Sequence, residues 1–296
     1  MPDPLRDLVD VHIHVVDPEI PGAKSTPGDD PLDLPLDELA DTLKHELASA
    51  GVSIALAMGR LDGPRDDALG VNGTLRLARL VPGLRAIGIA DPRKTPAANP
   101  EHFAVAERQL ASGKVVALKA YLGYVPVGPD DPGYRPYYRL AARYKVPVVF
   151  HTGDTWSTTA KVRFAQPLRV DDVAVDHPDV QFVLAHFGNP WMMDAAEVVF
   201  KNDNVWADLS GLIVGDESSF QTDPQGHPAP ETVWASWEPD FRKAYRYADK
   251  PERFLYGTDW PLAAMADYRK FIAAIIPPDH HAAVFRDNAR ALFGLK

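Results

Sequence analysis

The sequence predicts an α/β fold, built as a single-domain (β/α)₈ barrel. Three observations lead to this class. Apolar, β-branched runs alternate with segments of helical spacing eight times along the 296 residues. The runs are apolar almost throughout, as expected for parallel strands that are buried on both faces. Eight strand–helix units with right-handed crossovers fit this length and indicate a barrel.

Eight apolar runs are expected to form the strands. Each is bounded by Gly, Pro or polar residues. Pro147 lies at the start of the fifth run, where its missing N–H is tolerated. In chain order the strands are expected at residues 8–15, 52–58, 84–90, 115–122, 146–152, 180–187, 205–209 and 254–258.

The segments between the strands carry the helical spacing. Gly51 and Gly113 are placed to end the first and third helices as C-caps. A Pro/Gly-rich loop is expected at residues 17–34, and an acidic loop is expected to run from the seventh strand to about residue 230. The helices are expected at residues 36–50, 67–80, 100–112, 134–144, 170–176, 193–201, in a segment that ends at 247, and in closing segments through 288–295.

No linker, charge run or internal repeat marks a second domain, so one domain is expected over residues 1–296. A doubly wound open sheet is the alternative architecture. No G-x-G-x-x-G motif follows the first strand, which weakens that alternative as a dinucleotide-binding fold.

The charge and composition exclude several classes of partner and site. The net charge of −10 disfavours nucleic acid and anionic membrane surfaces, because phosphate binding requires basic patches. The chain has no cysteine, so any metal must be bound by His, Asp, Glu, Lys or water. No apolar run reaches the roughly 18 residues that span a bilayer. A cytoplasmic protein with a small-molecule substrate is expected, and a homo-oligomer is compatible with the sequence.

The first strand ends in two histidines that suggest a metal site. Side chains alternate along a strand, so His12 and His14 point the same way, roughly 7 Å apart along the strand. Imidazole is the commonest metal ligand in proteins. The alternative is a pair of histidines that only caps the strand, because two ligands do not complete a site.

Further reactive side chains follow the other strands. Active sites of this barrel lie at the carboxyl ends of the strands. Taken singly, each residue has a structural explanation, such as a hydrogen-bonded core histidine, an ion-paired lysine or a helix N-cap. Together they favour a metal site. The residues at these strand ends are Lys119, His151, His186 and Asp259.

The combined motifs resemble the amidohydrolase superfamily, specifically its amidohydrolase-related (amidohydrolase 2) branch of metal-dependent TIM-barrel hydrolases. The resemblance covers essentially the whole chain. It implies one divalent ion, usually zinc, bound by His12, His14, His151 and Asp259, with His186 contacting the reactive water or the substrate. The matching motifs are H-x-H at 12–14, K-x-Y at 119–121, F-H-T-G ending at 153, A-H-F-G ending at 188, G-T-D-W-P at 257–261 and the terminal N-A-R-A-L-F-G.

Three imidazoles and a carboxylate with room for water suit zinc or manganese, which activate a bound water. Asp259 is expected to accept the proton of that water, and His186 is expected to orient it or to stabilise a developing oxyanion. Asp10 lies one layer below His12. It is expected either to hold a ligand imidazole or to serve the core.

Lys119 leaves the number of metal ions open. In binuclear relatives a fourth-strand lysine is carboxylated and bridges two ions, and His151 and His186 would then serve the second ion. We expect one ion, with Lys119 pairing with substrate or an acid. A buried lysine near a dication has a depressed pKa, so either role is chemically accessible.

Loops at the same rim are expected to shape specificity. Lys161 and Arg163 could meet a substrate carboxylate. The aromatic residues could instead pack the loops themselves. Residues expected to contact substrate are Lys119, Tyr121, Trp156, Arg163 and Trp260, with Tyr124, Phe187 and Trp191 as further candidates.

The leading function is a metal-dependent hydrolase that cleaves an amide, ester or lactone-type bond of a small molecule. The alternative is a metal-dependent, non-oxidative decarboxylase of an aromatic or unsaturated carboxylic acid. A non-catalytic binding barrel is the third hypothesis, and the complete set of candidate metal ligands argues against it.

Overall fold

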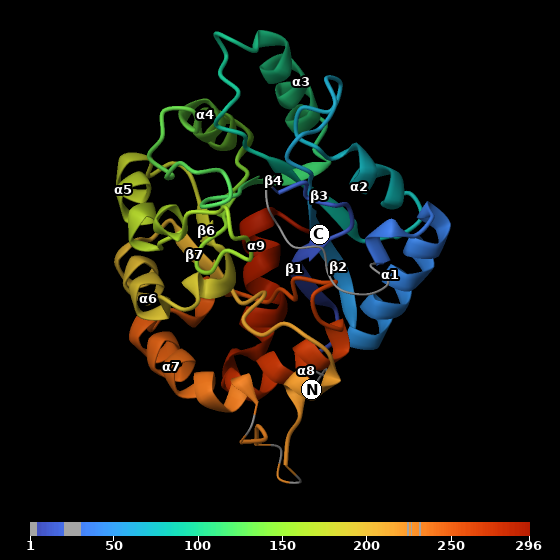
Figure 1. The fold of residues 1–296 in the computed structure, drawn as a ribbon, viewed down its shortest axis with the longest axis vertical. Helices are drawn as coiled ribbons and strands as arrows, with labels where there is room; N and C mark the ends of the chain where they lie inside the picture. The colour runs from blue at the N-terminus through green and yellow to red at the C-terminus, as the bar shows by residue number, and fades with distance from the viewer. Residues whose placement is uncertain (1–4, 21–30, 224, 226, 231) are drawn as a thin grey trace.

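Eight parallel strands form one sheet in the computed structural model of this chain, which describes residues 5–20, 31–223, 225, 227–230 and 232–296. Strands that follow one another in sequence are also neighbours in the sheet (Figure 1). This order confirms the predicted barrel topology and rules out the doubly wound open sheet. The strands are β1 (Leu8–His14), β2 (Val52–Met58), β3 (Leu84–Ile89), β4 (Val115–Ala120), β5 (Val148–Phe150), β6 (Phe182–Leu184), β7 (Val205–Asp208) and β8 (Phe254–Leu255).

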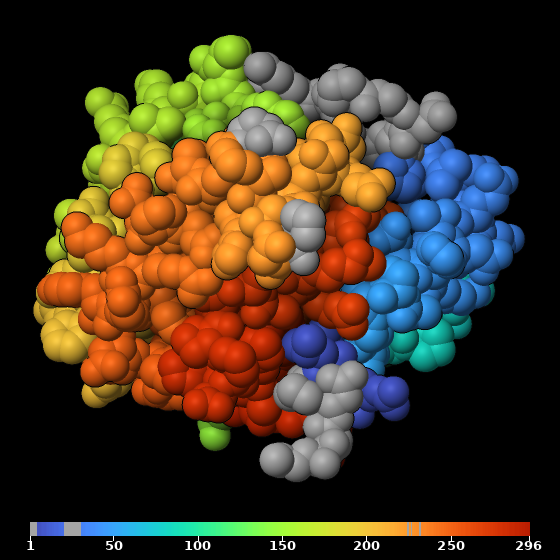
Figure 2. All heavy atoms as spheres, turned by 90° about the horizontal axis from the view of Figure 1, so that it is seen from below, coloured from blue at the N-terminus to red at the C-terminus, as the bar shows by residue number. Residues whose placement is uncertain are grey.

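The residues that follow β8 close the barrel against β1. The backbone N–H of Val11 donates to the carbonyl of Tyr256 at 3.0 Å, and that of His14 donates to the carbonyl of Trp260 at 2.7 Å. The N–H of Asp259 in turn donates to the carbonyl of His12 at 2.8 Å. These bonds join the first strand to the segment that follows the last one, and Figure 2 shows the red C-terminal residues beside the blue N-terminal ones.

Helices surround the sheet between successive strands. The bounds of the first helix agree with the prediction, and Gly51 ends it with a φ of 70°. The helices are α1 (Leu36–Ala50), α2 (Asn72–Leu77), α3 (Pro100–Ala111), α4 (Arg135–Tyr144), α5 (Leu168–Asp176), α6 (Met192–Lys201), α7 (Val233–Ala248), α8 (Met265–Ile275) and α9 (Asn288–Phe293).

The prediction of a helix over 67–80 is wrong at its start. The carboxylate of Asp67 accepts hydrogen bonds from the backbone N–H groups of Val71 and Asn72, both at 2.8 Å. Gly70, which lies between Asp67 and Val71 in the chain, has a φ of 65°. This side-chain-capped turn occupies the first predicted helical turn, and α2 begins only at Asn72.

Strands β5, β6 and β8 are shorter than predicted, and after each of them the chain turns away from the sheet at the rim. Gly153, His186 and Asp259 have φ values of 95°, 61° and 63°. A left-handed backbone cannot continue a strand. The apolar runs therefore end in turns that carry reactive side chains.

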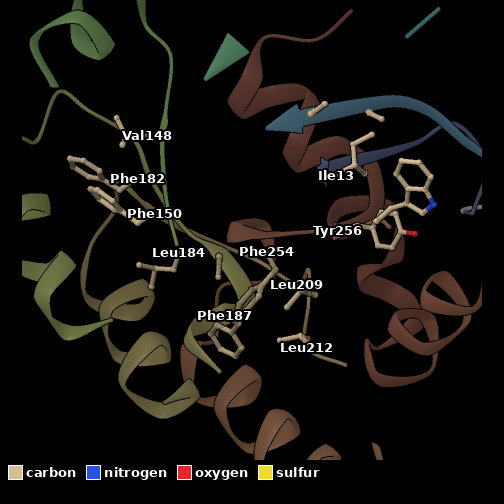
Figure 3. Close-up of a cluster of buried hydrophobic side chains, with 14 of the residues drawn as sticks. Ile13, Val148, Phe150, Phe182, Leu184, Phe187, Leu209, Leu212, Phe254 and Tyr256 are labelled. Carbon is tan, nitrogen blue, oxygen red and sulfur yellow. The ribbon is translucent and has the colours of Figure 1, made fainter. Parts of the chain in front are cut away.

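The core has two layers. The first layer lies inside the barrel and includes Val11, Leu56 and Val183, against which Phe293 of α9 packs. The larger layer lies between the sheet and the helices, where the rings of Phe150 and Phe182 stack with centroids 5.5 Å apart (Figure 3).

The described part of the chain contains no helix of sufficient length and apolar character to cross a membrane. Of the predicted loop at 17–34, residues 21–30 lie outside the described residues.

Candidate metal centre

Three predicted ligands meet at the carboxyl ends of the first and last strands. His12 and His14 come from β1, and Asp259 follows β8. The Nε2 atoms of His12 and His14 lie 3.4 and 3.3 Å from the Oδ1 of Asp259. The three ligand atoms lie within 4.8 Å of one another, so one ion could contact them all.

The hydrogen bonds of His12 leave one nitrogen for a metal. Its Nδ1 lies 3.0 Å from the Oδ2 of Asp208 and 2.9 Å from the Oγ of Ser210. Its Nε2 is buried and has no hydrogen-bond partner among the described residues. A buried nitrogen without such a partner is costly unless something binds it. The residues present therefore fit a divalent ion held by imidazole nitrogen and carboxylate oxygen, the donors that zinc and manganese accept.

Sequence reasoning missed Asp208 and Ser210 as members of this site. Asp208 is the last residue of β7, and its Oδ1 accepts hydrogen bonds from the N–H of Ser210 at 2.9 Å and of His186 at 3.2 Å. The Ser210 hydroxyl also donates to that oxygen. The signal was available, because Asp208 follows an apolar run at the same rim as the predicted ligands.

Burial and mutual charge give these groups defined protonation states. Burial, aided by the charge of Lys119, lowers the pKa of His12 to about 4, so the imidazole is neutral at pH 7. Burial would raise the pKa of Asp208, but its interactions with His12 outweigh burial and hold that pKa well below its usual range. The pKa of Asp259 is likewise held low against its burial, chiefly by His12 and His14. A neutral imidazole beside ionised carboxylates is the state that a metal requires.

His186 lies beside the three ligands. Its ring centroid is 5.0 Å from that of His12, and its Nδ1 is 3.1 Å from both the carbonyl oxygen and the Oγ of Ser210. An Nδ1–H that donates to Ser210 leaves the Nε2 lone pair free to accept a proton. Both His186 and Asp259 are non-glycine residues with positive φ, a strained conformation that is typical of functional sites.

The fourth predicted ligand, His151, stands outside this group of three. Its ring centroid is 5.0 Å from that of His186, and its Nε2 lies 2.8 Å from the carbonyl of Asp154. Nδ1 is then the nitrogen left for a metal. Its role as a ligand stays a prediction.

Lys119 is buried at the centre of the site. Its Nζ has no hydrogen-bond partner among the described residues and lies 5.4 Å from the ring centroid of Tyr121. Burial lowers its pKa to about 8, while the charges of Asp208 and Asp259 oppose that shift. The binuclear alternative, in which Lys119 and His186 serve a second ion, stays a prediction.

Gly211 allows the close approach of these groups. Its φ is 59°, and a Cβ at this position would lie 2.7 Å from the Oδ2 of Asp259 and 2.8 Å from the Nδ1 of His186. Both distances are below van der Waals contact. The turn after β7 therefore reaches the site only because residue 211 has no side chain.

Asp10 serves the fold. One of its carboxylate oxygens accepts the backbone N–H of His12 at 3.0 Å and that of Thr258 at 3.1 Å, and the other accepts the Thr258 hydroxyl at 2.7 Å. It joins β1 to the segment after β8. Of the two expectations for Asp10, the structure favours the core role, and Asp208 instead contacts the imidazole of His12.

The predicted substrate contacts divide into two groups. Tyr121 is buried near Lys119, and Tyr124 packs on His151 with centroids 4.8 Å apart while its hydroxyl accepts the N–H of Trp156 at 2.9 Å. The indole of Trp156 is exposed, so these loops can meet a substrate.

Trp260 and Phe187 belong instead to the core layer between the sheet and the helices, where Figure 3 shows Phe187 beside Phe254. That position does not support the predicted contact of either residue with substrate. Arg163 is exposed, and its guanidinium carbon lies 4.7 Å from the ring centroid of Phe164. A role for Arg163 in substrate binding stays a prediction.

Comparison with protein families gives one match, to a family model described as "Amidohydrolase" (Amidohydro_2), over residues 9–295. The search of curated proteins found no match.

Several solved structures have the same fold. An uncharacterized TIM-barrel protein from Bordetella bronchiseptica has 18% identity and a TM-score of 0.70, over 97% of this chain and 98% of that one. A probable 2-pyrone-4,6-dicarboxylic acid hydrolase from Acinetobacter baumannii has 16% identity and a TM-score of 0.62, over 97% and 99%. A 5-carboxyvanillate decarboxylase from Novosphingobium aromaticivorans, complexed with manganese, has 11% identity and a TM-score of 0.63, over 99% and 97%. At these identities the likeness is one of fold.

Proposed function

The chain belongs to the amidohydrolase family, and on that premise we propose that it is a metal-dependent hydrolase of an amide, ester or lactone-type bond in a small molecule. The observation that carries the proposal is the convergence of His12, His14 and Asp259 within 4.8 Å, with the Nε2 of His12 buried and free of hydrogen bonds to the described residues. One divalent ion, zinc or manganese, would be held by these residues, with His151 as the fourth ligand. When bound, that ion supplies Lewis-acid activation of a water and of the bond to be cleaved.

The other residues would position groups and move protons. His186, held through Nδ1 by Ser210, presents Nε2 as the acceptor for the proton of the attacking water. It takes this role in place of Asp259, the base expected from the sequence, because His12 and His14 hold the pKa of Asp259 low against its burial. The Lys119 ammonium supplies positive charge at the centre of the site, where negative charge develops on the substrate. Tyr124 and Trp156 would contact the substrate from the loops after β4 and β5.

A decarboxylase is the second candidate, and one comparison favours it. The manganese-containing structure from Novosphingobium aromaticivorans, a 5-carboxyvanillate decarboxylase, shares the fold over nearly the whole chain. On such a substrate, Lys119 would pair with the carboxylate, and the bond between the ring carbon and the carboxylate would break to release carbon dioxide, leaving its electron pair on the ring carbon. The Nε2 of His186, after it has accepted a proton from water, would donate that proton to the ring carbon.

The two reactions leave different products. The chain, loaded with zinc or with manganese, is assayed on a panel of lactones, esters, amides and aromatic carboxylic acids in ¹⁸O-labelled water. Hydrolysis predicts one ¹⁸O atom in the product carboxylate and no carbon dioxide. Release of carbon dioxide without ¹⁸O in the organic product establishes the second candidate. Full turnover after metal removal would overturn both.

The His186→Ala variant is assayed beside His45→Ala, which replaces an exposed histidine of α1. We expect kcat to fall by about 10²-fold or more in the first variant, as for loss of a general base, and to stay unchanged in the second.

A further inference from the structure

A surface cavity of about 550 Å³, open to solvent, lies at the opposite end of the barrel from the metal centre. Its lining residues come from α2, from the start of β3 and from the turn before β4, whereas the metal ligands follow the carboxyl ends of strands. A volume of this size accommodates a small molecule. The residues that line it are Asn72, Leu75, Arg76, Ala78, Arg79, Leu84, Arg85, Gly113 and Lys114.

The charged residues of this cavity are all cationic. Arg76, Arg79, Arg85 and Lys114 line it, and no carboxylate is among the lining residues. They come from three separate segments, so the fold, and not a basic run in the sequence, brings them together. The chain as a whole has a net charge of −10. A concentration of positive charge in an acidic protein requires a specific explanation.

None of these four cations forms an ion pair with a described residue, and Arg76, Arg79 and Lys114 are exposed to solvent. Some arginines elsewhere in the chain are paired. Arg93 bonds to Asp91 at 2.8 Å, and Arg169 pairs with Asp130 at 2.5 Å. The positive charge of this cluster is therefore not neutralised by a carboxylate in the part of the chain that the structure describes, and a bound anion would neutralise it.

The donor geometry selects the anion. Each guanidinium offers planar, paired N–H donors that match a phosphate or carboxylate, and the Nη1 of Arg85 donates to the Leu84 carbonyl at 3.0 Å, which orients that side chain. Four cations in one small cavity are balanced by three or four negative charges, a density that linked phosphates provide. Leu75, Ala78 and Leu84 add an apolar wall for an organic portion.

We propose that this cavity binds a small molecule with two or three linked phosphates, at a site separate from the metal centre and independent of the proposed function. The probe is inorganic tripolyphosphate, titrated calorimetrically into the full-length chain. The Arg76→Gln/Arg79→Gln variant is the test. The matched control is Arg135→Gln/Arg139→Gln, which removes the same charge from two exposed arginines of α4.

We expect saturable binding at one site per chain, weakened about tenfold or more in the test variant and less than about twofold in the control. Because tripolyphosphate also chelates metals, the titration is repeated on His14→Ala, and undiminished binding there separates this site from the metal centre. Equal weakening of tripolyphosphate binding in the two arginine variants would show that only the net charge of the chain matters, and would overturn the proposal. Absence of binding to the unmodified chain, or its loss in His14→Ala, would overturn it as well.

Discussion

The Nδ1 of His12 lies 3.0 Å from the Oδ2 of Asp208, with both side chains fully buried. The carboxylate fixes the tautomer of the imidazole, so that Nε2 faces Asp259 with its lone pair available. Asp208 thus orients a metal ligand that lies 196 positions away in sequence.

Replacing Asp208 by Asn is expected to weaken metal binding about 10- to 100-fold, as for loss of a carboxylate that orients a histidine ligand. The affinity is measured by competition with a chromophoric chelator. Asp130→Asn, which removes a partly exposed carboxylate paired with Arg169, is the control and should bind as the unmodified chain does. Equal affinities in the two variants would show that Asp208 does not orient His12.

Gly211→Ala is expected to abolish metal binding while the chain remains folded, because the new Cβ would stand 2.7 Å from the Oδ2 of Asp259. Gly294→Ala is a matched control, since Gly294 also has a positive φ, 62°, but nothing lies within 4 Å of its Cβ position. Circular dichroism verifies the fold of both variants, and the chelator competition measures the metal. Retained metal affinity in Gly211→Ala would contradict the geometry of the site.

The fold could be predicted because each apolar run is buried and each break is marked by Gly, Pro or polar residues. The bounds of β2 and α1 agree with the prediction for this reason. The rim was harder to predict. An aspartate at the end of a strand, such as Asp208, looks the same in sequence whether it caps a turn or bonds to a histidine 196 positions away. The direction in which the Trp260 side chain points depends on the left-handed turn at Asp259, and no local sequence pattern predicts that turn.

Asp10 is expected to make stability depend on pH. Burial raises its pKa to about 7, although hydrogen bonds from Thr258 and His12 oppose the shift. A carboxyl group whose pKa is raised on folding adds stability below its unfolded-state pKa, and this stability is lost as the pH rises through about 7. Between about pH 4 and pH 8 the metal-free chain should lose up to about 4 kcal/mol relative to Asp10→Asn. Urea denaturation of both proteins across this range measures the difference, and parallel stability curves would contradict the assignment.

Tyr124→Ala is expected to raise KM more than it lowers kcat, because Tyr124 holds the loop that carries Trp156 and touches the site only through the ring of His151. Tyr124→Phe keeps the ring but loses the hydroxyl that accepts the N–H of Trp156. Its KM should therefore lie between that of the unmodified chain and that of Tyr124→Ala. Steady-state kinetics on the substrate identified from the panel measures both. A KM in Tyr124→Ala equal to that of the unmodified chain would remove this residue from the substrate site.

The most direct measurement is an equilibrium titration of the metal-free chain with zinc and with manganese, followed by elemental analysis, for the unmodified chain, His14→Ala and Asp259→Asn. We expect one tightly bound ion per chain, and its loss or a large weakening in both variants, because each removes a ligand atom from the group within 4.8 Å. Undiminished binding in the variants would contradict a metal centre built on His12, His14 and Asp259. Two ions per chain would contradict the single-ion site and assign the second ion to Lys119 and His186.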